Sequence, residues 1–253
     1  MIRHEEVSIE EWATVLKRIE ASILGLRSAG VEFWLRPGKA ASEEKREITE
    51  PFSPAIASSA DALAAVREEL GDCTRCRLHA GRTTLVFGEG GPSPSLVFVG
   101  EGPGLDEDRQ GRPFVGRAGR LLDRMIRSIG FERREVYICN VVKCRPPNNR
   151  TPNPDEIETC SPFLFKQLEA LEPRVICTLG ACASQTLLAT ASLISRLRGK
   201  VHSWRGIPLV CTYHPAYLLR NPAQKAAVWT DLLLVRSLLA APERSTTRTR
   251  SLS

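Results

Sequence analysis

The sequence predicts an α/β fold in which helices cover both faces of a parallel sheet. Two observations carry this prediction. Short apolar runs rich in β-branched and aromatic residues recur along the chain, and segments with apolar residues at helical spacing separate them. The chain has 253 residues, of which 42% are hydrophobic, so it can bury a sizeable core. We expect one domain with an extension at each end.

The expected elements follow one another from residue 60 onward. A helix over residues 60–70 comes first and leads into a Cys-Thr-Arg-Cys segment. The expected strands are short and buried: residues 96–99, 135–140, 174–179 and 208–213. The expected helices are residues 119–128, 154–171, 181–188 and 224–240. Because strands and helices alternate, the carboxyl ends of the strands should meet at one edge of the sheet, where folds of this class bind ligands.

The two ends of the chain differ from this middle part. Apolar residues share one face of a predicted amphipathic helix over residues 8–29, and residues 36–60 have the composition of a linker. We therefore expect an appendage over residues 1–60, a folded domain over residues 61–241 and a polar, mobile tail over residues 242–253. Whether the first helix packs on the core or binds another protein is left open.

Charge and hydropathy narrow the kinds of partner and the cellular location that we expect. The formal net charge is +6, and residues 109–150 contain eleven Arg and Lys against three acids. That concentration fits a polyanion partner, although a solvated surface explains it equally well. No run of 18 apolar residues exists, and the first residues lack the apolar core of a signal peptide. We expect a cytoplasmic protein in a reducing environment, where cysteines serve as metal ligands or small hydrophobes.

The eight cysteines fall into two groups. Cys73 and Cys76 form a CxxC pair before the core, and Cys144 and Cys160 flank a loop rich in Pro and Asn. Four thiolates suit a zinc ion or an iron–sulfur cluster, and a redox role for the CxxC pair is a third interpretation. The other four lie in expected strands or begin a helix and resemble buried small hydrophobes: Cys139, Cys177, Cys182 and Cys211. Of these, Cys177 is a rival to Cys160 as a ligand.

Polar residues follow the expected strands where a pocket should lie. Asn140 ends one strand, His214 follows another, and Glu101, Glu107 and Phe114 belong to the glycine-rich loop of residues 100–119. An amide can pair with the edge of a nucleobase, a ring can stack on its face, and an imidazole can polarise a carbonyl. Each residue also has a simpler explanation: a turn asparagine, a capping histidine and a core aromatic. Together they indicate base recognition.

The segment between Pro215 and Pro222 carries two leucines and an arginine next to this pocket. Leu218, Leu219 and Arg220 could form part of a loop packed on the core, or a wedge that inserts into a base stack. The residues alone do not decide between the two.

Four blocks between residues 73 and 239 resemble the family-four uracil-DNA glycosylases, the iron–sulfur branch of the uracil-DNA glycosylase superfamily. They occur in the family order: GEGPG at 100–104 with Glu107 and Asp108 after it, GRPFVGRAG at 111–119, YICNVVKCRPP at 137–147 and HPAYLLR at 214–220. The resemblance implies a three-layer α/β/α fold around a four-stranded, mostly parallel sheet. It also implies a [4Fe-4S] cluster held by Cys73, Cys76, Cys144 and Cys160, and it assigns no ligand role to Cys177.

The resemblance further implies a role for each pocket residue. Phe114 would stack on uracil, Asn140 would pair with its edge and His214 would contact the pyrimidine O2. Gly102 and nearby backbone would line the floor, and Gly102 stands where another branch carries a catalytic Asp. Three groups then remain that could orient the attacking water, in this order: Asn140, Glu101 and Glu107.

The implied reaction is hydrolysis of the bond between uracil and deoxyribose, which begins base-excision repair. One branch of the superfamily traps the sugar covalently on a His in an inserted loop. Residues 109–112 contain no insertion and no His, so we expect repeated turnover rather than covalent capture. We expect a monomer acting on uracil-containing DNA, held by these residues: Arg112, Arg117, Leu218, Leu219 and Arg220.

Two other functions fit the same residues. One is a non-catalytic iron–sulfur protein of this fold that binds DNA or senses lesions. The other is a base-processing enzyme that acts on RNA or on hypoxanthine.

Overall fold

The computed structural model describes residues 58–242, and its sheet has six strands in the order β1-β3-β2-β4-β6-β5. The strands are β1 (Glu89–Gly90), β2 (Leu96–Gly100), β3 (Tyr137–Asn140), β4 (Val175–Leu179), β5 (Val201–Trp204) and β6 (Ile207–Thr212). The four inner strands run parallel, whereas β1 pairs antiparallel with β3 and β5 pairs antiparallel with β6. The expected parallel strands are confirmed, and helices flank them on both faces.

The expectation of four strands in all is wrong because it missed the two edges. Strand β1 has only two residues, too few for a period to emerge. Strand β5 is largely exposed and is joined to β6 by Arg205 and Gly206, which both have positive φ, 46° and 87°. Two successive residues with positive φ make the tight turn that suits a hairpin.

Eight α-helices are present among the described residues. They are α2 (Ser59–Leu70), α3 (Leu105–Gln110), α4 (Arg117–Ser128), α5 (Pro154–Leu171), α6 (Ala181–Leu188), α7 (Ile194–Leu197), α8 (Pro215–Arg220) and α9 (Lys225–Ala240). Short 3-10 turns complete the list: η1 (Arg77–Gly81), η2 (Arg133–Glu135), η3 (Pro147–Asn149) and η4 (Pro222–Gln224). The five longer helices match those expected from the sequence. Helices α3, α7 and α8 have six residues or fewer and were not expected.

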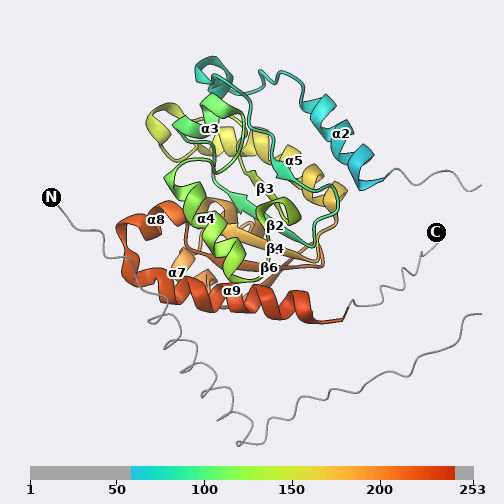
Figure 1. Ribbon diagram of the computed structural model, residues 1–253. Coiled ribbons are helices and arrows are strands. Elements are labelled where there is room, and N and C mark those ends of the chain that lie inside the picture. Colours follow the sequence, from blue (N-terminus) through green and yellow to red (C-terminus); the bar gives the residue numbers. More distant parts are fainter. Residues whose placement is uncertain (1–57, 243–253) are drawn as a thin grey trace, which may run out of the picture. The chain divides into compact units, whose positions relative to one another are not determined.

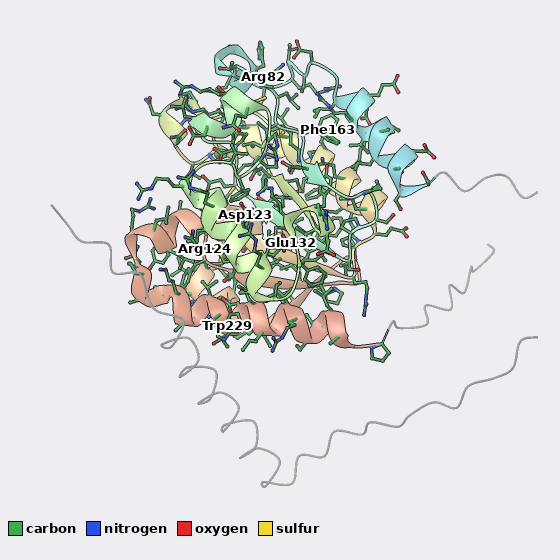
Figure 2. All side chains as sticks on the ribbon, viewed as in Figure 1. Arg82, Asp123, Arg124, Glu132, Phe163 and Trp229 are labelled. Carbon is green, nitrogen blue, oxygen red and sulfur yellow. The ribbon has the colours of Figure 1, made fainter. Side chains whose placement is uncertain are left out.

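The core lies on both faces of the sheet because side chains along a strand alternate between faces. In β2, Val97 and Val99 join a cluster with α5 and α6, whereas Leu96 and Phe98 join a second cluster with α4 and α9. Figure 1 shows α5 and α9 on opposite sides of the strands. Trp229, labelled on α9 in Figure 2, is a partly buried side chain that packs against the second cluster. The parallel strands are thus covered on both faces.

The ends of the chain are not part of this description. The helix expected over residues 8–29, nearly all of the linker and the tail lie outside the described residues. Among residues 58–242, no helix has both the length and the apolar character needed to cross a membrane.

Candidate active site

A cavity of about 510 Å³ lies at the carboxyl ends of the parallel strands. Residues that lie just beyond the ends of β2, β4 and β6 line it, together with residues from α3, α8 and the loop after β3. The chain connects β2 to β3 on one side and β3 to β4 on the other side of β2, so the cavity sits at a topological switch point. Five residues expected in the pocket all line it: Glu101, Glu107, Phe114, Asn140 and His214.

Asn140 presents an unused hydrogen-bond acceptor to the cavity. Its side chain is 1% exposed, and its Oδ1 is buried without a partner among the described residues. Gly100 lies beside it in the sheet, and a Cβ at Gly100 would come within 2.4 Å of that oxygen. The Nζ of Lys143, itself buried, donates to the Asn140 backbone carbonyl at 2.7 Å. Because a buried acceptor without a partner is costly, this amide is suited to a ligand that donates a hydrogen bond.

Phe114 forms one wall of the cavity from an unusual backbone conformation. Its φ is +50°, in the left-handed region that non-glycine residues rarely adopt. Gly119 makes this possible, because a Cβ there would come within 1.8 Å of the Phe114 carbonyl oxygen. The Phe114 and His214 rings have centroids 5.6 Å apart and planes inclined by 33°. The two rings therefore line the same cavity as a pair.

His214 is held as a neutral imidazole. It caps α8, and its Nδ1 accepts a hydrogen bond from the Ala216 backbone N–H at 3.1 Å. Burial, together with the nearby positive charge of Arg220, lowers the pKa of His214 to about 4. An acceptor at Nδ1 leaves the proton on Nε2, which can then donate to a ligand.

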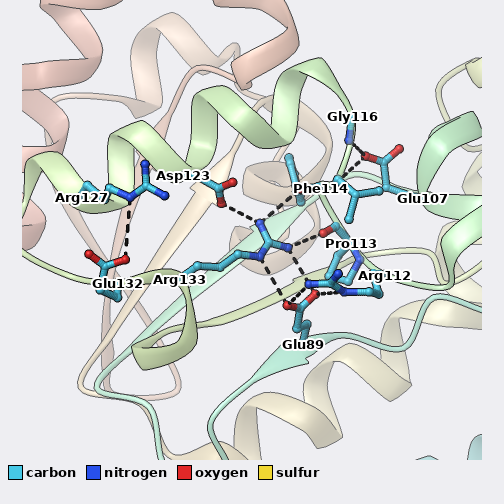
Figure 3. A network of polar contacts seen from close by, with 11 residues as sticks. Glu89, Glu107, Arg112, Pro113, Phe114, Gly116, Asp123, Arg127, Glu132 and Arg133 are labelled. Carbon is cyan, nitrogen blue, oxygen red and sulfur yellow. Dashed lines mark hydrogen bonds and ion pairs between the residues drawn. The ribbon is translucent and has the colours of Figure 1, made fainter.

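The two carboxylates of the pocket differ in their hydrogen bonding. Glu107 accepts three backbone hydrogen bonds, from Gly104 at 3.1 Å, Val115 at 2.9 Å and Gly116 at 3.0 Å. Figure 3 shows the bond to Gly116. It therefore holds the loop together, which sequence spacing did not predict. Glu101 makes no hydrogen bond through its side chain to another described residue, and burial raises its pKa.

The residues expected to contact DNA are only partly available at the surface. Leu218 is 1% exposed and belongs to the core, so its expected role as a wedge is corrected. Leu219, one residue along α8, is 36% exposed. The Arg112 guanidinium forms a bidentate pair with Glu89, at 2.7 and 3.0 Å. Arg117 is exposed at the start of α4, and Arg220 lines the cavity.

The loop between Cys144 and Cys160 forms a further wall that the sequence reasoning missed. Pro146, Asn149, Arg150 and Thr151 line the cavity. Arg150 is fixed by the fully buried Glu156, whose carboxylate accepts hydrogen bonds from both terminal nitrogens of the guanidinium, at 2.6 and 2.8 Å. The sequence signal that could have indicated this wall is the position of the loop between Cys144 and Cys160, two candidate metal ligands.

The four candidate cysteine ligands gather beside this wall. Burial raises the pKa of Cys160 to about 11, and the charges of Cys144 and Cys76 act in the same direction. Burial raises the pKa of Cys144 as well, and here the charges of Cys76 and Cys73 contribute. These four thiols therefore lie close enough to influence one another, whereas Cys177 interacts with Asp231 and Cys211 instead.

Arginines donate to two of these sulfurs. Arg82, labelled in Figure 2, donates to Cys144 Sγ at 3.3 Å, and Arg75 donates to Cys73 Sγ at 3.3 Å. Among residues 58–242, no three His, Cys, Asp or Glu side chains are grouped to hold a single metal ion. The four thiolates of a [4Fe-4S] cluster would each bind a different iron, so they would surround a larger group than a single ion. Four thiols, two of which accept hydrogen bonds from arginines, have the donor chemistry that such a cluster requires.

Known proteins of one family are similar to most of this chain. The family model described as the uracil DNA glycosylase superfamily matches residues 87–233. The type-4 uracil-DNA glycosylase of Thermotoga maritima is 51% identical over 158 residues, which cover 62% of this chain and 82% of the relative. Those of Sulfurisphaera tokodaii and Archaeoglobus fulgidus are 44% and 43% identical, covering 74% and 70% of this chain and 89% and 94% of theirs.

Proposed function

Because the chain belongs to the type-4 uracil-DNA glycosylases of the uracil-DNA glycosylase superfamily, we propose that its cavity binds a uracil turned out of DNA and releases it. The protein is a DNA N-glycosylase that acts in base-excision repair. The observation that carries the proposal for the site is the buried, unpartnered Oδ1 of Asn140, next to a ring that can stack on a base.

Three side chains recognise the base in this proposal. Phe114 stacks on its face, the Asn140 amide pairs with its edge, and the Nε2–H of His214 donates to the pyrimidine O2. A neutral donor suits this last role, because it stabilises negative charge that grows on O2 as the bond breaks. The low pKa of His214, about 4, keeps the imidazole neutral near pH 7.

The reaction breaks the bond between C1′ of the sugar and N1 of uracil. The electron pair of that bond leaves with uracil and spreads toward O2, while positive charge builds at C1′. Water then forms the new bond to C1′ and loses a proton, and uracil leaves after taking up a proton. The DNA backbone stays intact.

Glu101 is the carboxylate best suited to orient that water. Glu107 already accepts three backbone hydrogen bonds, whereas the Glu101 side chain makes none with the described residues. Position 102 carries no carboxylate, and a Cβ at Gly102 would lie 2.7 Å from a Val142 methyl group, so a side chain there would have to displace Val142. Asn140 can share the role through its amide.

The DNA strand would cross the mouth of the cavity. Arg150 and Arg220 line it and can contact phosphates, and Arg117 is exposed nearby on α4. Leu219 is exposed next to Arg220 and can enter the space left by the base. Arg112 would contact a phosphate only through the part of its guanidinium that Glu89 leaves open.

The proposed cofactor is a [4Fe-4S] cluster held by Cys73, Cys76, Cys144 and Cys160. When bound, it supplies four iron–thiolate bonds that join the segment before the sheet to both ends of the pocket loop. Arg75 and Arg82 would offset its negative charge through the N–H···S contacts at 3.3 Å. No step of the reaction passes through it.

The proposal is tested with purified protein and oligonucleotides that contain one uracil, in single and double strands. Alkali-sensitive abasic sites and free uracil are expected, and none from the same DNA with cytosine. Intact DNA after incubation with protein that carries its full complement of iron–sulfur cluster would favour a non-catalytic DNA-binding role. A panel with hypoxanthine and with RNA separates the remaining alternative.

A further inference from the structure

Arg133, which lies on η2 outside the cavity, uses every N–H of its guanidinium. Nη1 donates to the Phe114 carbonyl at 3.1 Å, and Nη2 donates to the Pro113 carbonyl at 2.6 Å. Nη1 also donates to Asp123 at 2.8 Å, while Nε and Nη2 reach Glu89 at 3.5 and 3.4 Å (Figure 3). Five donors therefore meet five acceptor contacts. The side chain is 19% exposed, so water competes little for these contacts.

The two carbonyls that Arg133 holds belong to the turn that presents the Phe114 ring. Phe114 has a φ of +50°, which costs free energy in a non-glycine residue and persists only where the surroundings enforce it. On one side, Gly119 lets α4 approach the Phe114 carbonyl oxygen. On the other side, Arg133 donates to the same oxygen and to the carbonyl before it. The turn is thus clamped from two directions.

The anchors of Arg133 are themselves fixed. Asp123 belongs to α4, and Glu89 belongs to β1, where it also binds Arg112. Burial would raise the pKa of Glu89, but hydrogen bonds from Arg112 and Arg133 lower it overall, which keeps this carboxylate charged. The guanidinium therefore ties the turn to an edge strand and to a helix at fixed angles.

We propose that Arg133 is a positioning residue for base capture, which sets the Phe114 ring at the angle and height that stack on uracil. This inference rests on the proposed function. A lysine cannot replace Arg133, because three donors on one nitrogen cannot reach two successive carbonyls and two carboxylates that lie in different directions.

The test measures inhibition by free uracil and single-turnover excision for five proteins: wild type, Phe114→Ala, Arg133→Lys, the double variant and Arg127→Ala. Loss of base stacking in Phe114→Ala should raise the inhibition constant for uracil by roughly 10- to 100-fold. Arg133→Lys should raise it by several-fold. The double variant should be no worse than Phe114→Ala, because Arg133 acts through that ring.

Arg127→Ala is the matched control. Arg127 lies on the neighbouring helix turn and pairs with Glu132 at 3.7 Å, but it does not contact the Phe114 turn (Figure 3). It should leave uracil inhibition unchanged. If Arg133→Lys unfolds, Asp123→Asn removes one anchor with little change in shape and should raise the inhibition constant by a smaller factor.

The outcomes separate the two proposals. Unchanged inhibition in folded Arg133→Lys, with a raised constant in Phe114→Ala, overturns the positioning role and leaves the glycosylase function intact. Additive losses in the double variant also overturn it, because they show that Arg133 acts independently of the ring. Absence of excision by the wild type overturns the proposed function itself.

Discussion

The backbone N–H of Ala216 donates to Nδ1 of His214 at 3.1 Å, so the cap of α8 and the protonation state of the pocket imidazole are a single feature. A protonated Nδ1 could not accept this bond. The helix start therefore favours the neutral ring with its proton on Nε2, and burial acts in the same direction.

His214 should accordingly remain neutral well below the ordinary histidine range. We expect its imidazole to titrate near pH 4 in a nuclear magnetic resonance experiment, with the signal assigned by its loss in His214→Asn. The excision rate should show no inflection near pH 6.5 from this group. Because the unfolded chain binds this proton near pH 6.5, the contribution of His214 to stability is complete above that pH and declines toward pH 4. A titration near 6.5 would contradict the neutral-donor role.

Gly100 should tolerate no side chain. A Cβ there would lie 2.4 Å from Asn140 Oδ1 and 2.5 Å from Phe114 Cζ, so Gly100→Ala must displace two base-binding groups. We expect excision to fall by about 100-fold, since small misplacements at a reacting site have effects of that order. Gly81→Ala is the control, because no atom lies within 4 Å of a Cβ at Gly81. Equal rates for the two variants would argue against the geometry given for the pocket.

The two pocket glutamates should separate activity from stability. Glu107→Ala removes three backbone hydrogen bonds and should lower the free energy of unfolding by about 1–3 kcal/mol. Glu101→Gln removes no hydrogen bond among the described residues, so it should leave thermal unfolding nearly unchanged while lowering the single-turnover rate. The reverse pattern would exchange the roles of the two residues.

The cysteines should divide cleanly by iron content. Cys160→Ser should lose iron and the visible absorbance of an iron–sulfur cluster, whereas Cys177→Ala should keep both. Cys177 is fully buried in β4, where it interacts with Asp231 and Cys211 rather than with the four candidate ligands. Iron analysis and absorbance of anaerobically purified protein measure this directly, with circular dichroism as the check on folding. Retained iron in Cys160→Ser would exclude that residue as a ligand.

The sequence predicted the parts of the fold that repeat a period over several residues. Strand β2 reads as an unbroken apolar run because both of its faces are buried, and α5 is long enough to show a helical pattern. The edge strands β1 and β5 were not predicted, because they are too short or too exposed to show such a pattern. Leu218 and Leu219 look equivalent in sequence, but the turn of α8 buries one and exposes the other.

The pocket was predictable where residues follow strands and was not where they act across the chain. Asn140 and His214 follow directly from strand ends. Arg133 reaches Glu89, 44 residues away, and no local pattern indicates such a pair. The same holds for Glu107, which the sequence suggested as a reacting group. Its backbone partners at residues 115 and 116 lie in a different turn, so the sequence around Glu107 does not reveal these hydrogen bonds.

The central claim is that the unpartnered amide of Asn140 recognises uracil, and the single-turnover excision rate of Asn140→Ala tests it most directly. Removing this side chain leaves no partner of its Oδ1 unsatisfied, so the variant should fold. The account predicts that uracil release falls by roughly 100- to 1000-fold, as when a donor or acceptor that serves the transition state is lost. A folded Asn140→Ala protein that releases uracil at the wild-type rate would contradict it.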